Sequence, residues 1–247
     1  MNKDTWTAFR KTAKHYRSFI EKTDASLPDL SKYIQKLVEK REGTYYTVKK
    51  AVVYNEALDD FGEESEIKII LVGDNPGRRE QENGRYLVGP SGKIAEGFFR
   101  NNPELGIDFR KNVLILNKTP IHSPRTTELK ILFTLGGKQL EDAVFSTQQI
   151  MARLLMEFWK ALASLRPKIW IIGYSEMKKG GIFEVYTETL KQLCIDSPEF
   201  KENILFFRHF SMNQFAIDLK NRSQSGESTA ESLKRIGKMY RERVLGS

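Results

Sequence analysis

The chain contains almost no cysteine and no long apolar run, and each absence excludes a class of protein. Cys194 is the only cysteine among 247 residues, so one chain cannot build a disulfide framework, a zinc cluster or a Cys-ligated iron–sulfur cluster. No apolar run is long enough to span a membrane, and the first residues, up to Trp6, lack the charge pattern of a signal peptide. We therefore expect a cytoplasmic protein with no membrane partner.

The composition is that of a soluble globular protein with a basic surface. Hydrophobic residues make up 40% of the chain and charged residues 29%, which excludes a disordered chain. The length allows one large domain or two small ones. The formal net charge of +8 fits a polyanion partner such as nucleic acid, but a solvated Lys/Arg surface gives the same excess.

Short apolar runs alternate with helical patterns along the chain. Four runs predict strands, at residues 67–72, 113–116, 169–172 and 204–207. Helical spacing predicts helices over 5–22, 29–41, 91–100 and 147–165, and a capping box at Ser228 opens a last helix that runs to Val244. This alternation predicts an α/β fold, with three α/β/α layers around a central, mostly parallel four-stranded sheet.

Polar side chains follow three of the predicted strands. Asp74 and Asn75 come after the first strand, Asn117 ends the second, and His209 follows the fourth. Because parallel strands end at the same edge of a sheet, we expect these groups to converge on one cleft. There they would provide acid/base, water-positioning and anion-stabilising groups. Taken singly, each has a structural explanation, such as an Asx turn, a turn cap or a buried histidine.

The glycine-rich segment that joins the first strand to the next helix carries a resemblance to a known family. It contains Gly73-Asp-Asn-Pro-Gly77, then Glu80, then Gly84-Arg-Tyr-Leu-Val-Gly89-Pro-Ser-Gly92. These motifs, with Leu114-Ile-Leu-Asn117 and His209-Phe-Ser-Met-Asn213 further along, resemble those of the uracil-DNA glycosylase superfamily, and its family 4 above all. The resemblance covers roughly residues 65–220 and implies a uracil-DNA glycosylase-like fold.

The chain also departs from the family 4 pattern at several positions. The four cysteines of the family 4 iron–sulfur cluster are missing. The catalytic Glu of family 4 falls on Asp74, whereas the mismatch-specific and single-strand-selective families use an Asn that falls on Asn75. The base-stacking Phe falls on Leu87, next to Tyr86, and the Pro of the His-Pro-Ser motif falls on Phe210. Both Asp74 and Asn75 therefore remain candidates for holding the water.

The resemblance implies a monomeric, monofunctional DNA glycosylase that removes uracil or a related deaminated base from DNA in base excision repair, with no metal and no other cofactor. It assigns catalysis to Asp74, Asn75 and His209. Substrate binding falls to Gly73, Glu80, Tyr86, Leu87 and Asn117. DNA binding falls to Ser91, Lys93, Lys118, Ser211, Met212 and Asn213, with Arg125 a further candidate for a phosphate contact. In this interpretation residues 1–60 form a helical extension packed on the core, and residues 61–247 form the α/β domain.

Two other functions remain open at this point. Leu87 and Phe210 favour a superfamily member that binds nucleic acid or a nucleotide with little or no cleavage. A small-molecule hydrolase could use the same cleft. Individual residues have alternatives too, since Met212 could pack beneath its loop instead of entering DNA, and Glu80 could be a surface residue.

Overall fold

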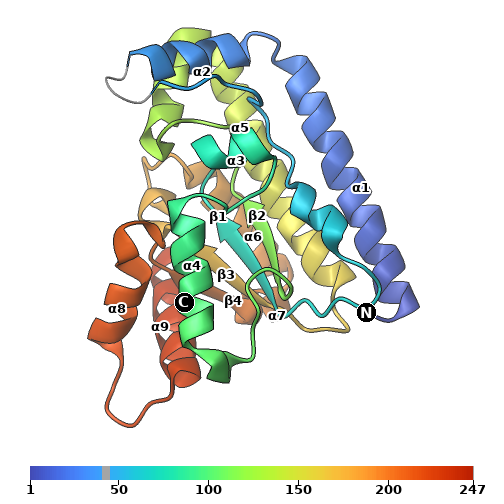
Figure 1. Ribbon diagram of the computed structural model, residues 1–247, viewed down its shortest axis with the longest axis vertical. Helices are drawn as coiled ribbons and strands as arrows, with labels where there is room; N and C mark the ends of the chain where they lie inside the picture. Colours follow the sequence, from blue (N-terminus) through green and yellow to red (C-terminus); the bar gives the residue numbers. More distant parts are fainter. Residues whose placement is uncertain (41–44, 247) are drawn as a thin grey trace.

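The computed structural model describes residues 1–40 and 45–246, and its centre is a four-stranded sheet (Figure 1). The strands are β1 (Ile69–Gly73), β2 (Val113–Asn117), β3 (Lys168–Ile172) and β4 (Ile204–Phe207). They lie in the order β2-β1-β3-β4, and every neighbouring pair is parallel. The predicted parallel sheet and α/β/α fold are therefore confirmed, and the three strand ends that precede the polar residues lie at one edge.

Each strand is buried on both faces, because its alternate side chains enter two separate apolar cores. In β1, Ile70 and Val72 belong to one core, whereas Ile69 and Leu71 belong to the other. This is the period of two that a strand imposes on its side chains. It also explains why the strands read as continuous apolar runs in the sequence.

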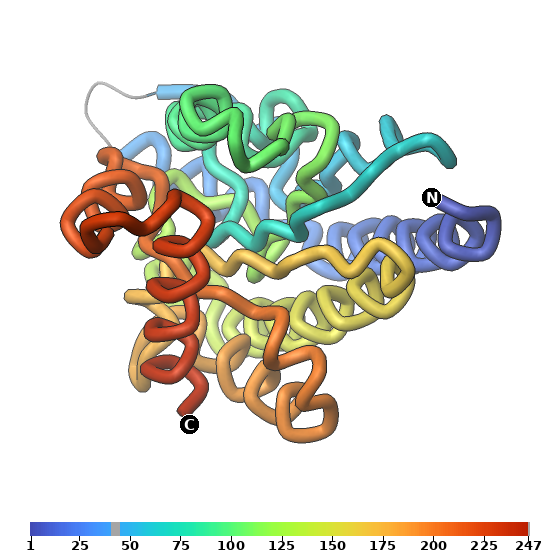
Figure 2. Tube along the Cα trace, turned by 90° about the horizontal axis from the view of Figure 1, so that it is seen from below, coloured from blue at the N-terminus to red at the C-terminus, as the bar shows by residue number. Residues whose placement is uncertain are grey.

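Helices cover both faces of the sheet (Figure 2). The core on one face is shared with α1 (Lys3–Ser26), α2 (Leu30–Glu39), α5 (Leu129–Ala161), α6 (Glu184–Asp196) and α7 (Pro198–Asn203). The other face is covered by α4 (Pro90–Asn101) and α8 (Gln214–Arg222), while α9 (Thr229–Leu245) packs against β4. The helix α3 (Arg78–Asn83) lies in the loop between β1 and α4. Five short 3₁₀ helices complete the described elements: η1 (Glu56–Asp60), η2 (Pro103–Leu105), η3 (Thr126–Glu128), η4 (Tyr174–Met177) and η5 (Ser211–Asn213).

The helix boundaries differ from the predicted ones in a few places. The helix predicted over 147–165 begins at Leu129 and ends at Ala161, with a bend at Gly137, whose φ is +64°. The sequence patterns do not predict the helices α3, α6, α7 and α8. The helices α3 and α7 are only one or two turns long. The buried face of α6 includes Thr187 and Cys194, so it does not show the regular spacing of large apolar residues that predicts a helix. The capping box at Ser228 is confirmed. The predicted end of the second helix, Arg41, lies outside the described residues.

The first helix packs directly on the α/β core. Phe9 and Tyr16 of α1 contact Phe158 of α5, with ring centroids 5.8 and 6.3 Å apart. The Tyr16 hydroxyl also lies 2.8 Å from the hydroxyl of Tyr86, which belongs to the glycine-rich segment. The N-terminal helices thus share one apolar core with the sheet, while the proposed division at residue 60 stays a prediction.

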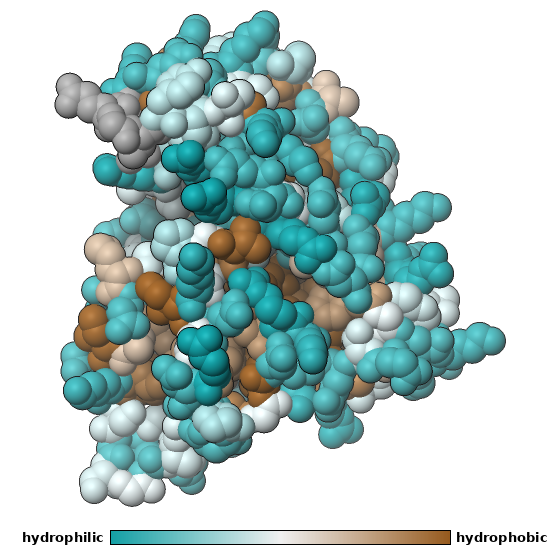
Figure 3. Space-filling model, in the orientation of Figure 1, coloured by the Kyte–Doolittle hydropathy of each residue, from teal (hydrophilic) through white to brown (hydrophobic). Residues whose placement is uncertain are grey.

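The surface is mostly hydrophilic on the face shown in Figure 3, with apolar side chains in small patches. Among the described residues, no helix combines the length and the apolar character needed to cross a bilayer. Few large apolar side chains are well exposed, and Met212 is the most exposed of them at 80%.

Candidate active site

A cleft opens at the carboxyl edge of the sheet, where the sequence predicts one. Its volume is about 580 Å³, which lies in the range of small-molecule sites. The predicted site residues that line it are Gly73, Asp74, Asn75, Glu80, Leu87, Ser91, Asn117, Arg125, His209, Ser211 and Met212. Residues from three strand ends, up to 139 positions apart in the chain, therefore meet in one cavity.

Asp74 projects from the end of β1 and is held from below by a buried ammonium. Lys118 Nζ donates to Asp74 Oδ1 at 2.5 Å, and the Asp74 side chain is only 15% exposed. The carboxylate lies against Gly173, at the end of β3, where an added Cβ would come within 2.6 Å of Oδ1. Gly173 also has a φ of +76°, so both space and backbone require glycine there.

Asn75 is engaged at both ends of its amide. Its Nδ2 donates to Ser123 Oγ at 3.0 Å and to the Pro76 carbonyl at 3.2 Å, while its Oδ1 accepts from Thr126 Oγ1 at 2.8 Å. These bonds tie the loop after β1 to the loop after β2. The geometry therefore favours Asn75 as a residue that fixes the loop, and it favours Asp74 as the group that acts on a water.

Asn117 ends β2 with its side chain directed at the cleft. The residue is 4% exposed, and no other described residue makes a hydrogen bond with its amide. An added Cβ at Gly73 would lie 2.5 Å from Asn117 Oδ1, so the glycine makes room for the amide. A nearly buried amide without a protein partner is placed to bind a polar ligand, because burial without a hydrogen bond costs free energy.

His209 faces the same cleft in a defined tautomer. The backbone N–H of Ser211 donates to His209 Nδ1 at 3.0 Å, so Nδ1 is an acceptor and the ring proton lies on Nε2. Burial lowers the pKa of His209, and the Asp74 carboxylate opposes this effect. At neutral pH the ring is therefore a neutral Nε2–H donor.

Glu80 and Leu87 connect the first part of the glycine-rich segment, around Gly77, with its second part, around Gly89. The Glu80 carboxylate accepts from the Gly77 backbone N–H. Burial raises the pKa of Glu80, while the backbone amides of Gly77, Leu87 and Gly89 act in the opposite sense. Glu80 is thus a loop-fixing group that also touches the cleft. Leu87 is 6% exposed and lines the cavity with a left-handed backbone, at φ +49°.

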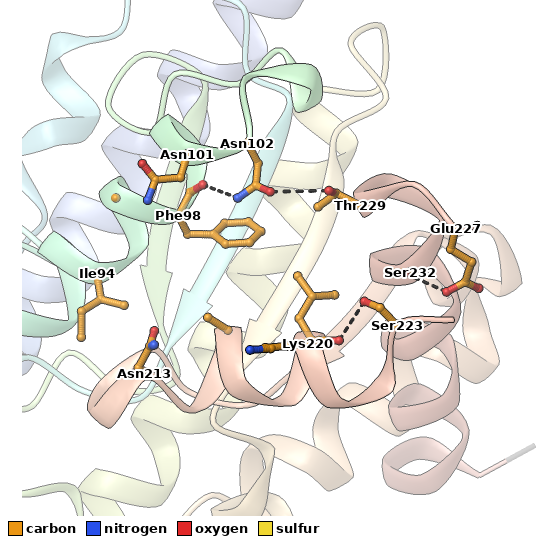
Figure 4. Close-up of a pocket in the computed structure, with 13 residues that line it drawn as sticks. Ile94, Phe98, Asn101, Asn102, Asn213, Lys220, Ser223, Glu227, Thr229 and Ser232 are labelled. Carbon is orange, nitrogen blue, oxygen red and sulfur yellow. Dashed lines mark hydrogen bonds between the residues drawn. The ribbon is translucent and has the colours of Figure 1, made fainter. Parts of the chain in front are cut away.

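The structure corrects the roles expected for Lys118 and Tyr86, whereas the DNA contacts expected for Lys93 and Asn213 stay predictions. Lys118 is fully buried and bonded to protein atoms, so it is not placed to contact a DNA phosphate. Tyr86 is also buried, where its hydroxyl donates to the Val53 carbonyl at 2.6 Å, so it does not line the base pocket. Lys93 is exposed on α4 and lies outside the cleft lining. Asn213 lines a different groove, between α4 and α8 (Figure 4).

That second groove has a volume of about 500 Å³, and several of its polar groups bind one another. Asn102 Nδ2 donates to the Phe98 carbonyl at 2.7 Å, and Ser232 Oγ donates to Glu227 at 2.7 Å (Figure 4). Glu227 also accepts from Arg235 at 2.6 Å. Because the Glu227 carboxylate is already paired, this groove offers fewer groups for catalysis than the cleft at the strand ends.

The sequence interpretation missed other parts of the cleft. Ser123 and Thr126 hold Asn75, and the segment after β3 contributes Gly173, Ser175 and Glu176 to the lining. The rule used for the other strands, that the residues after a parallel strand face the site, would have found this segment. No local pattern marks Ser123 or Thr126, because their partner lies about 50 residues away.

No group of three or more His, Cys, Asp or Glu side chains in the described parts of the chain is arranged to hold a metal ion. The residues also do not fit the iron–sulfur cluster of family 4, because Cys194 is buried within the core and has no second cysteine.

Comparison with known proteins agrees with this geometry. Residues 60–176 match the sequence model described as the Uracil DNA glycosylase superfamily. This stretch includes β1, the glycine-rich segment, β2 and β3, but ends before His209. No curated protein matches the chain in sequence. The matched stretch covers 117 of the 247 residues, and the three-layer α/β/α fold agrees with that of the uracil-DNA glycosylase superfamily.

Proposed function

We propose that this protein is a DNA glycosylase that hydrolyses the N-glycosidic bond of uracil or a related deaminated base. The observation that carries the proposal is the meeting of Asp74, Asn117 and His209 in one cleft. A carboxylate, a free amide and a neutral N–H donor are the groups that this hydrolysis needs. The family match supports a glycosylase-type activity, and the three side chains supply its chemistry.

Asp74 is placed to orient the attacking water. Its Oδ1 is held by Lys118, and its Oδ2 has no hydrogen bond from the described residues. The water oxygen would bond to C1′ as the C1′–N bond breaks, and the bonding pair would leave with the base. Asp74 would take up the water proton, which ends on the departed base. Its negative charge would also stabilise the cationic sugar formed on the way.

His209 is placed to stabilise the leaving base. Its Nε2–H can donate to the base O2, where negative charge develops as the bond breaks. A preorganised donor of this kind typically contributes about 3 kcal/mol to the barrier, or roughly 100- to 1000-fold in rate. The hydrogen bond from Ser211 to Nδ1 holds the ring in the tautomer that can donate.

Asn117 is placed to recognise the base. Its amide can donate to O4 of uracil and accept from N3–H at the same time. Cytosine presents the opposite pattern, which would leave buried polar groups unpaired at about 1–3 kcal/mol each.

The base can reach this cleft only after it leaves the duplex stack. Met212 lies at the rim, is 80% exposed and has a left-handed backbone with φ +51°. Its exposure shows that it does not pack beneath its loop, so we infer that it enters the gap left by the base. Arg125, exposed at the rim, is a candidate for a phosphate contact.

The product should be an intact abasic site. A glycosylase that also cuts the strand forms an imine between an amine and the sugar aldehyde. Lys118 is the amine bonded to Asp74, but it is fully buried behind that carboxylate, so it cannot reach the sugar.

The proposal is tested by incubating the protein with oligonucleotides that carry uracil, hypoxanthine or xanthine, in single strands and in U:A or U:G pairs. Alkali then cuts the strand at any abasic site. We expect Asp74→Asn and His209→Ala each to lower the single-turnover rate by roughly 100-fold or more. Asn75→Ala should mainly lower thermal stability. A wild-type protein that cleaves none of these substrates would overturn the proposal.

One observation favours a second candidate, a superfamily member that binds nucleic acid without cleaving it. Leu87 stands in the cleft where family 4 enzymes have a stacking aromatic. Phe210 does not add to this case, because it is fully buried and stacks on Phe215 with ring centroids 4.4 Å apart. Salt-dependent DNA binding by the folded protein, with no cleavage of any substrate in the panel, would support this function.

A further inference from the structure

The cleft is built over a buried cation, Lys118, whose contacts reach beyond Asp74. Lys118 directly follows Asn117 at the end of β2, and its side chain is 0% exposed. Its Nζ donates to Asp74 Oδ1 at 2.5 Å, to the Ile172 carbonyl at 2.6 Å and to the Gly73 carbonyl at 3.4 Å. A lysine ammonium has three donors, and all three have acceptors.

These contacts indicate that Lys118 is charged despite its burial. A neutral amine would have only two hydrogens for three oxygens. The aromatic ring of Phe183 lies 5.0 Å from Nζ and adds a favourable contact for a cation. Burial of Lys118 lowers its pKa, and the Asp74 carboxylate raises it. The two charges therefore compensate for each other's loss of water.

Lys118 also connects the strand ends that form the cleft. It reaches from β2 to the last carbonyl of β1 and to the last carbonyl of β3. In the chain, Asp74 directly follows Gly73, and Gly173 directly follows Ile172. One side chain thus fixes the backbone from which the carboxylate projects and the glycine against which it lies.

We propose that Lys118 is a positioning residue, which binds Asp74 Oδ1 from beneath and thereby directs Oδ2 to a water in the cleft. This role rests on the proposed hydrolysis at Asp74 and extends it, because it names the group that fixes the carboxylate. It also explains how an aspartate can serve where a longer glutamate stands in family 4. The shorter side chain is fixed by a cation beneath it.

Other charged groups face Asp74 from the elements around the cleft. Glu80 comes from α3, Glu176 from η4, Arg125 from the loop after β2 and His209 from the loop after β4. None of them makes a hydrogen bond to Asp74. Lys118 is the one described cation bonded to it, so its loss should dominate any change in the orientation of the Asp74 carboxylate.

The test replaces Lys118 by methionine, which has a similar length and no charge. We expect the single-turnover rate of Lys118→Met to fall by roughly 100-fold, because the Asp74 carboxylate loses its hydrogen bond from Nζ, while the affinity for a uracil-containing oligonucleotide stays close to that of the wild type. A purely structural role would lower the rate and the affinity together.

Two further measurements keep the outcome decisive. If Lys118→Met does not fold, the reciprocal variant Asp74→Asn is used, with the Lys118 Nζ signal followed in ¹⁵N-labelled protein; its pKa should fall when the carboxylate is removed. If the wild-type protein cleaves no DNA, the proposed glycosylase activity fails, but the Lys118 Nζ signal still reports on the Lys118–Asp74 pair. A single-turnover rate that is the same in wild type and folded Lys118→Met overturns the inference, as does a Lys118 pKa that does not fall in Asp74→Asn.

Discussion

Leu87 lies in the cleft with a backbone conformation that a leucine rarely adopts. Its φ of +49° carries a cost on the order of 1–3 kcal/mol. The surrounding structure holds it there, because Arg110 donates to the Leu87 carbonyl at 2.9 Å. That same carbonyl lies so close to Gly92 that an added Cβ would come within 1.6 Å of it. The strain places an apolar side chain where a flipped base would lie.

We expect Leu87→Phe to bind a uracil-containing single strand more tightly. Stacking of a base on an aromatic ring contributes about 1–3 kcal/mol, which corresponds to roughly 5- to 150-fold in affinity. The measurement is fluorescence anisotropy with an oligonucleotide in the Asp74→Asn background, so that no product forms. Leu87→Met, which adds no ring, is the matched control. Equal affinities for the three proteins would show that no base stacks at this position.

At the scale of the elements, α1 supports the glycine-rich segment through a buried pair of tyrosines. Tyr16 of α1 and Tyr86 share a hydrogen bond of 2.8 Å between their hydroxyls. Tyr86 also donates to the Val53 carbonyl at 2.6 Å. Burial raises the pKa of both hydroxyls, so they stay neutral. The N-terminal helix is therefore connected to the loop that carries Leu87.

We expect Tyr86→Phe to lower the free energy of unfolding by about 1–3 kcal/mol, because the Val53 carbonyl and the Tyr16 hydroxyl would lose a buried partner. Tyr186→Phe is the control, since its buried hydroxyl has no hydrogen-bond partner in the described structure. That change should be neutral or stabilising. Both values come from denaturant unfolding. A loss that is equal in the two variants would contradict the role of the tyrosine pair.

At the scale of the whole molecule, folding removes titratable groups from water. His122 is completely buried, with Nδ1 2.7 Å from the Pro76 carbonyl and Nε2 2.9 Å from the Tyr46 hydroxyl. Burial lowers the pKa of His122 to about 4. The unfolded chain, with an ordinary histidine pKa near 6.5, therefore binds a proton first as the pH falls.

The free energy of unfolding should consequently fall as the pH drops from about 6.5 to about 4. The pKa difference corresponds to a loss of about 3 kcal/mol across this window, and the contribution of His122 is fully present above it. We expect His122→Asn, whose amide can still donate to Pro76, to show a flatter dependence. Denaturant unfolding at a series of pH values measures both slopes. If the variant and the wild type have the same slope, the buried histidine does not control acid stability.

Some residues of the site could be predicted from the sequence, and the roles of others could not. Asp74, Asn117 and His209 follow parallel strands, and the rule that such strands end at one edge was enough to bring them together. The choice between Asp74 and Asn75 could not be made in this way. It depends on Ser123 and Thr126, which engage the Asn75 amide, and on a lysine that lies beneath Asp74.

The sequence alone determined the four strands, their mostly parallel pairing and the edge at which the polar side chains gather, because apolar runs and glycine-rich loops can be read locally. It also carried the motifs of the superfamily. Tertiary structure decided which polar side chains are free and which are engaged. Lys118 and Tyr86 look like surface and pocket residues in the sequence, yet both are buried. Their partners, Asp74 and Tyr16, lie 44 and 70 positions away, and only folding brings such groups within hydrogen-bond distance.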